Sequence, residues 1–445
     1  MASYFKEIGV TAVWLSPIFT SPMADFGYDI SNFTDIDPLF GTIEDFEELV
    51  ATFRELDIKI LLDFVPNHSS NEHPWFLKSI KNDTDYKDFY VWRNPKYDIN
   101  GTRLPPNNWI SVFSGSAWEW VPERGQYYLR QFAIQQPDLD YRNPAVKGNM
   151  TAVINFWLDK GVDGFRMDAV AHCFEAANFT DEPAKPGTPG NTYETLQHIY
   201  TQNQPETYAM LKEWAEMLHE RSQQDGRQRV MILEVYYPTP LAVTYYGSGN
   251  ASLMFPFNFN LLTYGNQSVR APFIKSLIDD WIFYAPKGSQ YNWAVGNHDN
   301  IRAANRYGTE MVDSINLLTG VLPGIKVVYN GEEMGMENTY VRWDQTVDPS
   351  GIRLGPYRYL EGSRDPQRTP MQWDDTPSSG FSQDQDTWLP INPNYWWLNV
   401  EAQRNSKTSH LKVFQTLMQA RKDPVLQYGG VDLYAPDNDT LVIKR

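Results

Sequence analysis

Cysteine is almost absent from the sequence: the single residue Cys173 excludes an intrachain disulfide framework. No run of 18 apolar residues occurs and no signal peptide opens the chain, so no membrane segment is expected in it. No glycine-rich phosphate loop follows a predicted strand, which argues against a nucleotide-binding open sheet. Basic residues are scarce too, with 38 Lys and Arg against 55 Asp and Glu and a formal charge of −17. This balance disfavours nucleic acids and anionic membrane surfaces as partners.

Aromatic residues, by contrast, are abundant, because the 445-residue chain has 15 Trp and 26 Tyr. Such residues often belong to the core, but they also line sugar-binding clefts, where rings stack on the apolar faces of pyranoses. The length allows one large domain with an insertion, or two or three ordinary domains. Nine Asn-x-Ser/Thr triplets occur, which is compatible with a glycoprotein that follows the secretory route.

Short apolar segments alternate with amphipathic helices along most of the chain. One helix is predicted to begin after Thr42 as its N-cap, and another to run from Pro144 to a stop at Gly161. This alternation implies right-handed parallel βαβ units, in either a (β/α)₈ barrel or a doubly wound sheet. The segments expected to contain strands are Gly9–Pro17, Ile58–Pro66, Gly161–Val170, Arg229–Val235, Leu253–Phe259, Tyr291–Asp299 and Gly324–Gly331.

Two long stretches break the alternation. Residues 69–142 lack a strong period and are too long for a loop in a compact domain, so a small inserted domain is predicted there. Residues 332–393 are predicted to form a long polar loop, and residues 431–445 one or two strands around a turn. In the barrel alternative, residues 1–68 and 143–425 form the barrel, residues 69–142 the inserted domain, and residues 426–445 the tail that follows.

Polar side chains follow several of the predicted strands. In a barrel the carboxyl ends of the strands face the active site, so these side chains should gather at one end. Arg166 and Asp168 lie two residues apart, so they share one side of their strand. They are either a buried structural ion pair or a nucleophile that the guanidinium keeps ionised. The other strand ends carry His68, Glu234, His298 and Asp299.

Three carboxylates from different strands suit glycosidic bond cleavage. A retaining glycosidase needs a nucleophile and an acid/base with carboxyl groups about 5–5.5 Å apart. Asp168 fits the nucleophile, and apolar neighbours of Glu234 should raise its pKa, as a proton donor requires. Asp299 could stabilise oxocarbenium-like charge, and His68 and His298 could bind sugar hydroxyls. A divalent metal site is the competing use, but no His-x-His or His-Glu-x-x-His spacing supports it.

Several ordered motifs resemble those of the α-amylase superfamily, glycoside hydrolase family 13, and above all its α-glucosidase branch, which includes insect maltases. Three further motifs are similar to the oligo-1,6-glucosidase-like members. The motifs are GVTAVWLSP at 9–17, DFVPNH at 63–68, GFRMDAV at 164–170, Glu234 and GNHD at 296–299, then QPDLD at 136–140, GEEMGM at 331–336 and TPMQW at 369–373.

The resemblance implies a role for each site residue. Asp168 would be the nucleophile, Glu234 the acid/base and Asp299 the transition-state stabiliser. Tyr28 would stack on the terminal glucose. Asp29 paired with Arg364 would clamp its far hydroxyls and make the enzyme exo-acting, with Arg166 kept beside the nucleophile and Arg368 the alternative arginine for the clamp.

The resemblance also describes a longer protein. The first barrel strand and an acidic calcium loop would precede residue 1, and the C-terminal β-sandwich would continue past residue 445. The barrel is therefore expected to lack its first strand here. The chemistry needs no cofactor, and a structural calcium would belong to the missing loop. The full-length protein would be secreted or anchored to a membrane.

Two alternatives use the same fold. A transglycosylase or sucrose isomerase would employ the same site on the same sugars. A catalytically inactive glycosidase-like protein, such as an amino-acid-transporter heavy chain, would serve for binding. Those heavy chains have lost catalytic residues, whereas Asp168, Glu234 and Asp299 are all present here. The leading interpretation is an α-glucosidase acting on maltose, sucrose or short oligosaccharides.

Overall fold

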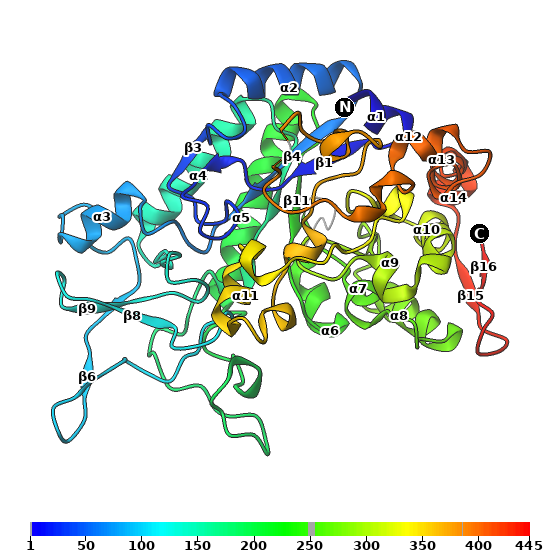
Figure 1. Ribbon diagram of the computed structural model, residues 1–445. Helices are drawn as coiled ribbons and strands as arrows, with labels where there is room; N and C mark the ends of the chain where they lie inside the picture. The colour runs from blue at the N-terminus through cyan, green and yellow to red at the C-terminus, as the bar shows by residue number, and fades with distance from the viewer. Residues whose placement is uncertain (1, 248–253, 385) are drawn as a thin grey trace. The chain divides into compact units, whose positions relative to one another are not determined.

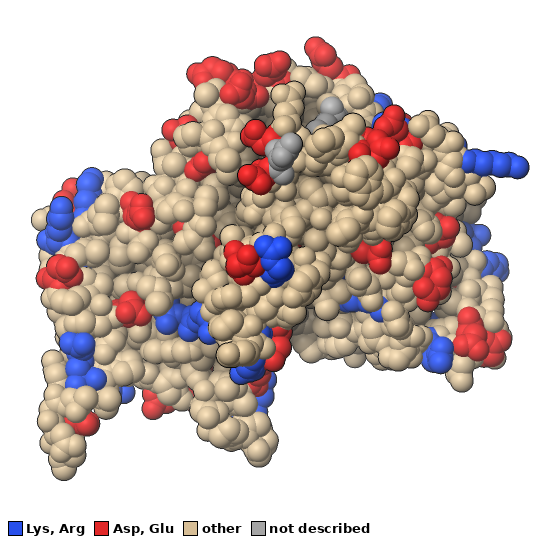
Figure 2. Space-filling view, in the orientation of Figure 1, with Lys and Arg blue, Asp and Glu red and all other residues tan. Residues whose placement is uncertain are grey.

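The computed structural model describes residues 2–247, 254–384 and 386–445 (Figure 1). By its internal contacts the chain divides into two compact units. The N-terminal unit is Ala12–Val235, and the C-terminal unit is Met1–Thr11 with Tyr236–Arg445. No helix in the described parts of the chain is both long and apolar enough to cross a membrane. Acidic and basic side chains are interspersed over the face seen in Figure 2.

The N-terminal unit contains a parallel sheet with its helices and several shorter antiparallel strands. The strands are β1 (Ala12–Leu15), β2 (Phe19–Thr20), β3 (Asn32–Ile36), β4 (Lys59–Phe64), β5 (Trp92–Arg93), β6 (Lys96–Tyr97), β7 (Arg103–Leu104), β8 (Trp118–Val121), β9 (Gln126–Leu129), β10 (Gly164–Met167) and β11 (Val230–Leu233). The helices are α2 (Ile43–Glu55), α3 (Pro74–Ile80), α4 (Pro144–Asp159) and α5 (Pro205–Asp225).

Strands β1, β4, β10 and β11 are parallel hydrogen-bonded neighbours in that order. Along the chain, α2 lies between β1 and β4, α3 and α4 lie between β4 and β10, and α5 lies between β10 and β11, which is the predicted βαβ alternation. Arg166 pairs in register with Asp63 on β4 and with Ile232 on β11. This register brings the polar residues near the ends of three adjacent strands to one edge of the sheet.

The predicted helix boundaries in this unit are confirmed. Thr42 caps α2 through a capping box in which its side chain accepts from the Asp45 N–H and the Asp45 side chain accepts from the Thr42 N–H. Pro144 is the first residue of α4. The chain leaves α4 at Gly161, whose φ of +99° is accessible to glycine without strain. A Cβ at Gly161 would also lie 3.0 Å from Val50, so α2 and α4 approach closely there.

The region predicted as an insertion contains no strand of the parallel sheet. It forms an antiparallel sheet in the order β5, β9, β8, a hairpin of β6 and β7, and helix α3. Its core is aromatic: Val91, Trp109, Ala117, Trp118, Tyr127 and Leu129 are buried together. Trp109 donates a hydrogen bond from Nε1 to the carbonyl of Thr180, so this core extends beyond the predicted insertion.

The C-terminal unit also alternates helices with parallel strands, and β13 pairs in parallel with β14. Its strands are β12 (Met254–Pro256), β13 (Asn292–Ala294), β14 (Ile325–Val327), β15 (Asp432–Tyr434) and β16 (Val442–Lys444). Its helices are α1 (Ala2–Glu7), α6 (Thr239–Ala242), α7 (Asn260–Tyr264), α8 (Ala271–Tyr284), α9 (Ala303–Tyr307), α10 (Val312–Val321), α11 (Pro349–Leu354), α12 (Val400–Asn405), α13 (His410–Ala420) and α14 (Pro424–Tyr428).

Within this unit, α1 packs on the C-terminal helices, because Tyr4 and Ile8 share a buried cluster with Leu411 and Phe414 of α13. The antiparallel pair β15–β16 is the predicted tail of one or two strands. Leu253, where another strand was expected to begin, lies outside the described residues. The stretch predicted as a polar loop, residues 332–393, contains α11 and several single helical turns. These segments are too short to produce a hydrophobic period in the sequence.

Candidate active site

In the N-terminal unit, Arg166 on β10 holds a cluster of three carboxylates. Its Nη1 contacts Asp63 Oδ1 at 3.1 Å and also Asp168, and its Nη2 lies 2.5 Å from Glu234 Oε1. Burial alone would lower the pKa of Arg166, but the carboxylates of Asp63, Glu234 and Asp168 outweigh it and raise that pKa well above its usual value. The guanidinium is therefore a fixed positive charge beneath both predicted catalytic carboxylates.

The strand register explains why these groups meet. Asp168 lies two residues after Arg166, and Glu234 lies two residues after Ile232, the register partner of Arg166. Side chains two apart share one side of a sheet, so both carboxylates reach the same guanidinium. Their side chains are only 11% and 12% exposed. The two residues assigned to bond cleavage from the sequence are thus brought together by one cation.

Glu234 does not have the apolar surroundings predicted for it. Its Oε1 contacts Arg166, and its Oε2 accepts a hydrogen bond at 3.0 Å from the Ala169 N–H. Ala169 has a φ of +46°, in the left-handed region that non-glycine residues rarely adopt. The apolar neighbours of Glu234 in the sequence did not reveal these two polar contacts, because Arg166 and Ala169 belong to β10 and to the segment after it.

Asp63 belongs to the cluster but was not assigned a role from the sequence. It is 1% exposed and accepts hydrogen bonds from Trp14 Nε1 at 3.2 Å and from the Tyr28 hydroxyl at 3.0 Å. Burial raises the pKa of Asp63 to about 6, against the opposing charge of Arg166. The available signal was a carboxylate inside the apolar run of β4, where an ionised group needs a partner. Asp63 therefore orients the side chains of Arg166 and Tyr28 through these contacts.

Tyr28 and His68 lie side by side in the same unit and are both buried. The His68 ring nitrogens lie 2.9 Å from Asn67 Oδ1 and 3.2 Å from the Tyr28 carbonyl oxygen. Burial lowers the pKa of His68 to about 4, so the imidazole is neutral near pH 7. The Tyr28 hydroxyl is bound to Asp63, which fixes the plane of its ring.

Asp29, which is predicted to clamp the far hydroxyls of the terminal glucose, lies at the end of a tight loop. Asp29 has no exposed surface, and its carboxylate accepts from the N–H groups of Ala24 and Asp25 and from the Ser21 hydroxyl. These hydrogen bonds hold the loop that precedes Asp29 in one conformation. Its neighbour Asp25 is also buried and accepts from Gln136 Nε2 at 3.1 Å.

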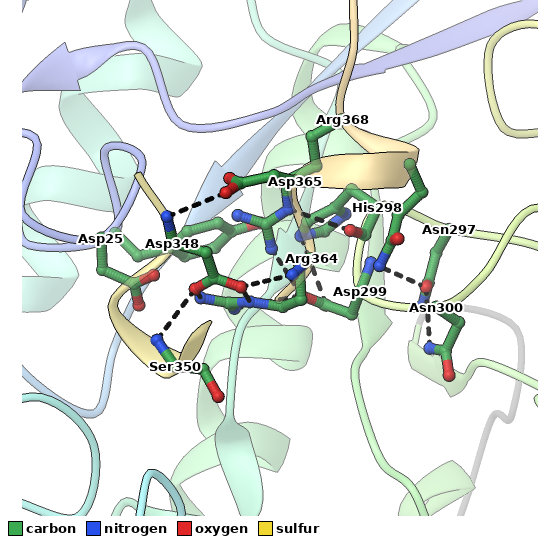
Figure 3. A network of polar contacts seen from close by, with 12 residues as sticks. Asp25, Asn297, His298, Asp299, Asn300, Asp348, Ser350, Arg364, Asp365 and Arg368 are labelled. Carbon is green, nitrogen blue, oxygen red and sulfur yellow. Dashed lines mark hydrogen bonds and ion pairs between the residues drawn. The ribbon is translucent and has the colours of Figure 1, made fainter. Parts of the chain in front are cut away.

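In the C-terminal unit, Asp299 follows β13 and is held by two arginines and a histidine (Figure 3). Asp299 Oδ1 lies 2.7 Å from Arg368 Nη2 and 3.3 Å from Arg364 Nη1. Its Oδ2 lies 3.3 Å from His298 Nε2, and its N–H donates to Asn297 Oδ1. The Asp299 side chain is 24% exposed, which leaves part of the carboxylate accessible.

Arg364, the arginine predicted for the sugar clamp, and Arg368, the alternative, both contact Asp299. Arg368 Nε donates to the His298 carbonyl at 2.9 Å while its Nη2 contacts Asp299. Arg364 binds Asp348 through Nε at 3.0 Å and Nη2 at 2.8 Å. Arg364 thus contacts the carboxylates of Asp348 and Asp299 within the C-terminal unit.

No group of three or more His, Cys, Asp and Glu side chains that could hold a metal ion occurs among the residues for which the structure gives positions. The N-terminal unit supplies the carboxylates of Asp168 and Glu234 on one guanidinium, and the C-terminal unit supplies that of Asp299 with two arginines. Carboxylates of this kind can act as nucleophile, proton donor and electrostatic stabiliser.

A family model described as the catalytic domain of α-amylase matches residues 2–429. The chain belongs to the α-amylase family. Maltase 1 of Drosophila virilis is 48% identical over 99% of this chain and 71% of its own length, and the salivary alpha-glucosidase of Aedes aegypti is 43% identical over 99% and 77%. The crystal structure of an alpha-glucosyl transfer enzyme, XgtA, has a TM-score of 0.90 and 34% identity, covering 100% of this chain and 83% of that one. Both the family and the α-glucosidase resemblance inferred from the motifs are confirmed.

Proposed function

We propose that this chain, a glycoside hydrolase of the α-glucosidase type, removes terminal non-reducing α-linked glucose from maltose, sucrose and short oligosaccharides with retention of configuration. The observation that carries the proposal is the contact of one guanidinium, Arg166, with both Asp168 and Glu234 at the ends of adjacent strands. A retaining glycosidase requires two carboxyl groups close to the same glycosidic bond. The maltase and α-glucosidase relatives support the same substrate class.

In the first step, Asp168 attacks the anomeric carbon and the glycosidic C–O bond breaks while Glu234 gives its proton to the leaving oxygen. In the second step, Glu234 takes a proton from water, the water oxygen attacks the anomeric carbon, and the bond to Asp168 breaks. Asp299 stabilises the positive charge that develops on the ring in both steps. Glu234 must be protonated before the first step, so substrate binding has to weaken its contact with Arg166.

The remaining residues bind the terminal glucose. Tyr28 offers a ring held in one plane by its hydroxyl bond to Asp63, which suits stacking on a sugar. His68 and His298 bind hydroxyls of this glucose. Arg364 blocks the sugar chain from extending beyond it, so that only terminal glucose units are released. Asp29, whose carboxylate its own loop holds in place, acts with Arg364 on the far hydroxyls of this glucose.

The proposed framework is a (β/α)₈ barrel of residues 1–68 and 143–425 that lacks its first strand in this chain. Residues 69–142 form the inserted domain, and residues 426–445 begin a C-terminal β domain. The double displacement uses carboxylates alone, so we propose no cofactor for the chemistry. Salivary α-glucosidases among the relatives support secretion of the protein.

The test is hydrolysis of 4-nitrophenyl α-glucoside and of maltose by the full chain, with the Asp168→Asn variant alongside. We expect the variant to lose at least roughly 10⁴-fold in kcat while keeping its unfolding temperature, because the nucleophile is removed and the shape is not. NMR of the first-formed sugar should give α-glucose. A wild-type chain without hydrolysis contradicts the proposed function, and first-formed β-glucose contradicts retention.

A second candidate, transfer of glucose to another sugar or isomerisation of sucrose, is favoured by the similarity to an alpha-glucosyl transfer enzyme. Both reactions share the glycosyl-enzyme intermediate and differ in what replaces water as acceptor. Chromatography of the products after incubation with sucrose separates them. Glucose and fructose alone indicate hydrolysis, whereas a new disaccharide indicates transfer or isomerisation. A non-catalytic binding protein would leave sucrose unchanged.

A further inference from the structure

Two carboxylates in the C-terminal unit join residues 347–350 to residues 363–368. Asp348 binds the side chain of Arg364, and Asp365, the next residue along, binds the backbone beside Asp348. Both carboxylates have no exposed surface. The two segments are therefore joined by hydrogen bonds at two adjacent positions, as Figure 3 shows.

Asp348 determines the direction of Arg364. It accepts from Arg364 Nε at 3.0 Å, from Nη2 at 2.8 Å and from the backbone N–H at 2.5 Å. A guanidinium bound through Nε and Nη2 is fixed in its plane, because two parallel bonds define its orientation. The remaining nitrogen, Nη1, is the one that lies 3.3 Å from Asp299 Oδ1.

Asp365 in turn fixes the backbone that carries Asp348. Its Oδ2 accepts from the N–H groups of Val347 at 3.0 Å and Asp348 at 3.3 Å, and from the Ser363 hydroxyl at 3.1 Å. These three hydrogen bonds hold the backbone at residues 347–348 in place. The position of the Asp348 side chain is restricted with it.

We propose that Asp348 is a positioning residue for Arg364. It holds Nε and Nη2 of Arg364, so that only Nη1 is directed at Asp299 and Arg364 does not form a two-nitrogen ion pair with that carboxylate. This inference rests on the proposed function, in which Asp299 stabilises the transition state. Asp348 shares the positive charge of Arg364 through two bonds, so Asp299 keeps capacity to interact with the sugar. Asp348 itself is fully buried, so it acts through Arg364.

Asp348 has a second, purely structural contact that the test must separate. As the N-cap of α11, it accepts from the Ser350 N–H at 3.1 Å. Asn is as good an N-cap as Asp and has nearly the same shape. The Asp348→Asn substitution therefore preserves the cap and removes the charge, and replaces one acceptor oxygen by an NH₂ group that repels Arg364.

The experiment compares Asp348→Asn with Glu361→Gln in the full chain, using 4-nitrophenyl α-glucoside. Glu361 makes an equally bidentate contact, with Arg358, but on the surface. We expect Asp348→Asn to lower kcat/KM on the order of 10- to 100-fold, mainly in kcat, because a small displacement of a positioned charge has effects of this size. Glu361→Gln should match the wild type.

A double-mutant cycle with Arg364→Met identifies the route of the effect. If Asp348 acts through Arg364, Asp348→Asn should change kcat/KM less than about 2-fold in the Arg364→Met background. An unchanged kcat/KM for Asp348→Asn alone, or the same loss in both backgrounds, overturns the inference. A wild-type chain that does not hydrolyse the glucoside contradicts the proposed function instead, so the two failures are distinguishable.

Discussion

Arg166 and Asp63 are register partners on adjacent parallel strands, and Arg166 Nη1 lies 3.1 Å from Asp63 Oδ1. Asp63 is buried beneath the cluster and also accepts from Tyr28 and Trp14. A carboxylate with three donors in a buried position fixes all three donors at once. The consequence is that the guanidinium under the proposed nucleophile has one orientation before any sugar arrives.

Asp63→Asn should therefore reduce both stability and activity. The amide keeps the size of the side chain but turns one acceptor into a donor that faces Arg166, which leaves a buried polar contact unmade. We expect a loss of about 1–3 kcal/mol in the free energy of unfolding, measured with urea, and a lower kcat/KM. Asp57→Asn, at an exposed pair with Lys59, is the control and should change neither quantity. Equal behaviour of the two variants would contradict a role for Asp63.

Arg368→Lys should reduce activity although the charge is kept. Arg368 bridges the His298 carbonyl and the Asp299 carboxylate with two different nitrogens, and a single ammonium cannot reproduce that fork. We expect kcat/KM to fall on the order of 10- to 100-fold. Arg358→Lys changes an exposed arginine of the same region and should have no effect. The measurement is steady-state hydrolysis of 4-nitrophenyl α-glucoside.

Gly296→Ala should disturb the segment that leads to His298 and Asp299. A Cβ at Gly296 would lie 2.0 Å from Glu332 Oε1, and Glu332 is buried and holds the Tyr329 N–H through its other oxygen. We expect a loss of about 1–3 kcal/mol in stability together with a lower kcat.

The matched control for that substitution is Gly148→Ala. Gly148 lies in α4, and a Cβ there meets nothing within 4 Å. This variant should be unchanged or more stable by up to about 1 kcal/mol, because alanine favours a helix. Wild-type activity and stability for Gly296→Ala would show that Glu332 moves aside without cost.

His73→Asn should make stability less sensitive to acid. Burial lowers the pKa of His73 to about 3 from the ordinary 6.5, and its Nδ1 caps α3 by accepting from the Trp75 N–H. As the pH falls below about 6.5 the unfolded chain takes up a proton that the folded imidazole resists, so this contribution, present above that pH, declines toward pH 3.

Asn keeps an acceptor at the cap and cannot titrate in this range. Urea unfolding at pH 7 and pH 5 should show roughly 1–2 kcal/mol less loss of stability on acidification for the variant than for the wild type. Buried carboxyl groups with raised pKa values, such as Asp138 and Glu332, contribute in the opposite direction. Because both proteins share those groups, the difference between them isolates His73. Parallel pH profiles would contradict the assignment.

The sequence by itself determined the features that depend on neighbours along the chain. The capping of α2 by Thr42, the start of α4 at Pro144 and the shared side of Arg166 and Asp168 follow from local hydrogen bonding and from the period of a strand. The family was also readable, because its motifs are short runs of consecutive residues. These features need no knowledge of which strands become neighbours.

Only the tertiary structure decided what each carboxylate touches. Asp63 became the partner of Arg166 through the register of β4 and β10, and Glu234 met that guanidinium instead of its apolar neighbours in sequence. Asp29 accepts hydrogen bonds from its own loop, and Asp348 accepts from the Arg364 side chain. A charge inside a fold is defined by the donors within about 4 Å of it, which come from distant parts of the chain.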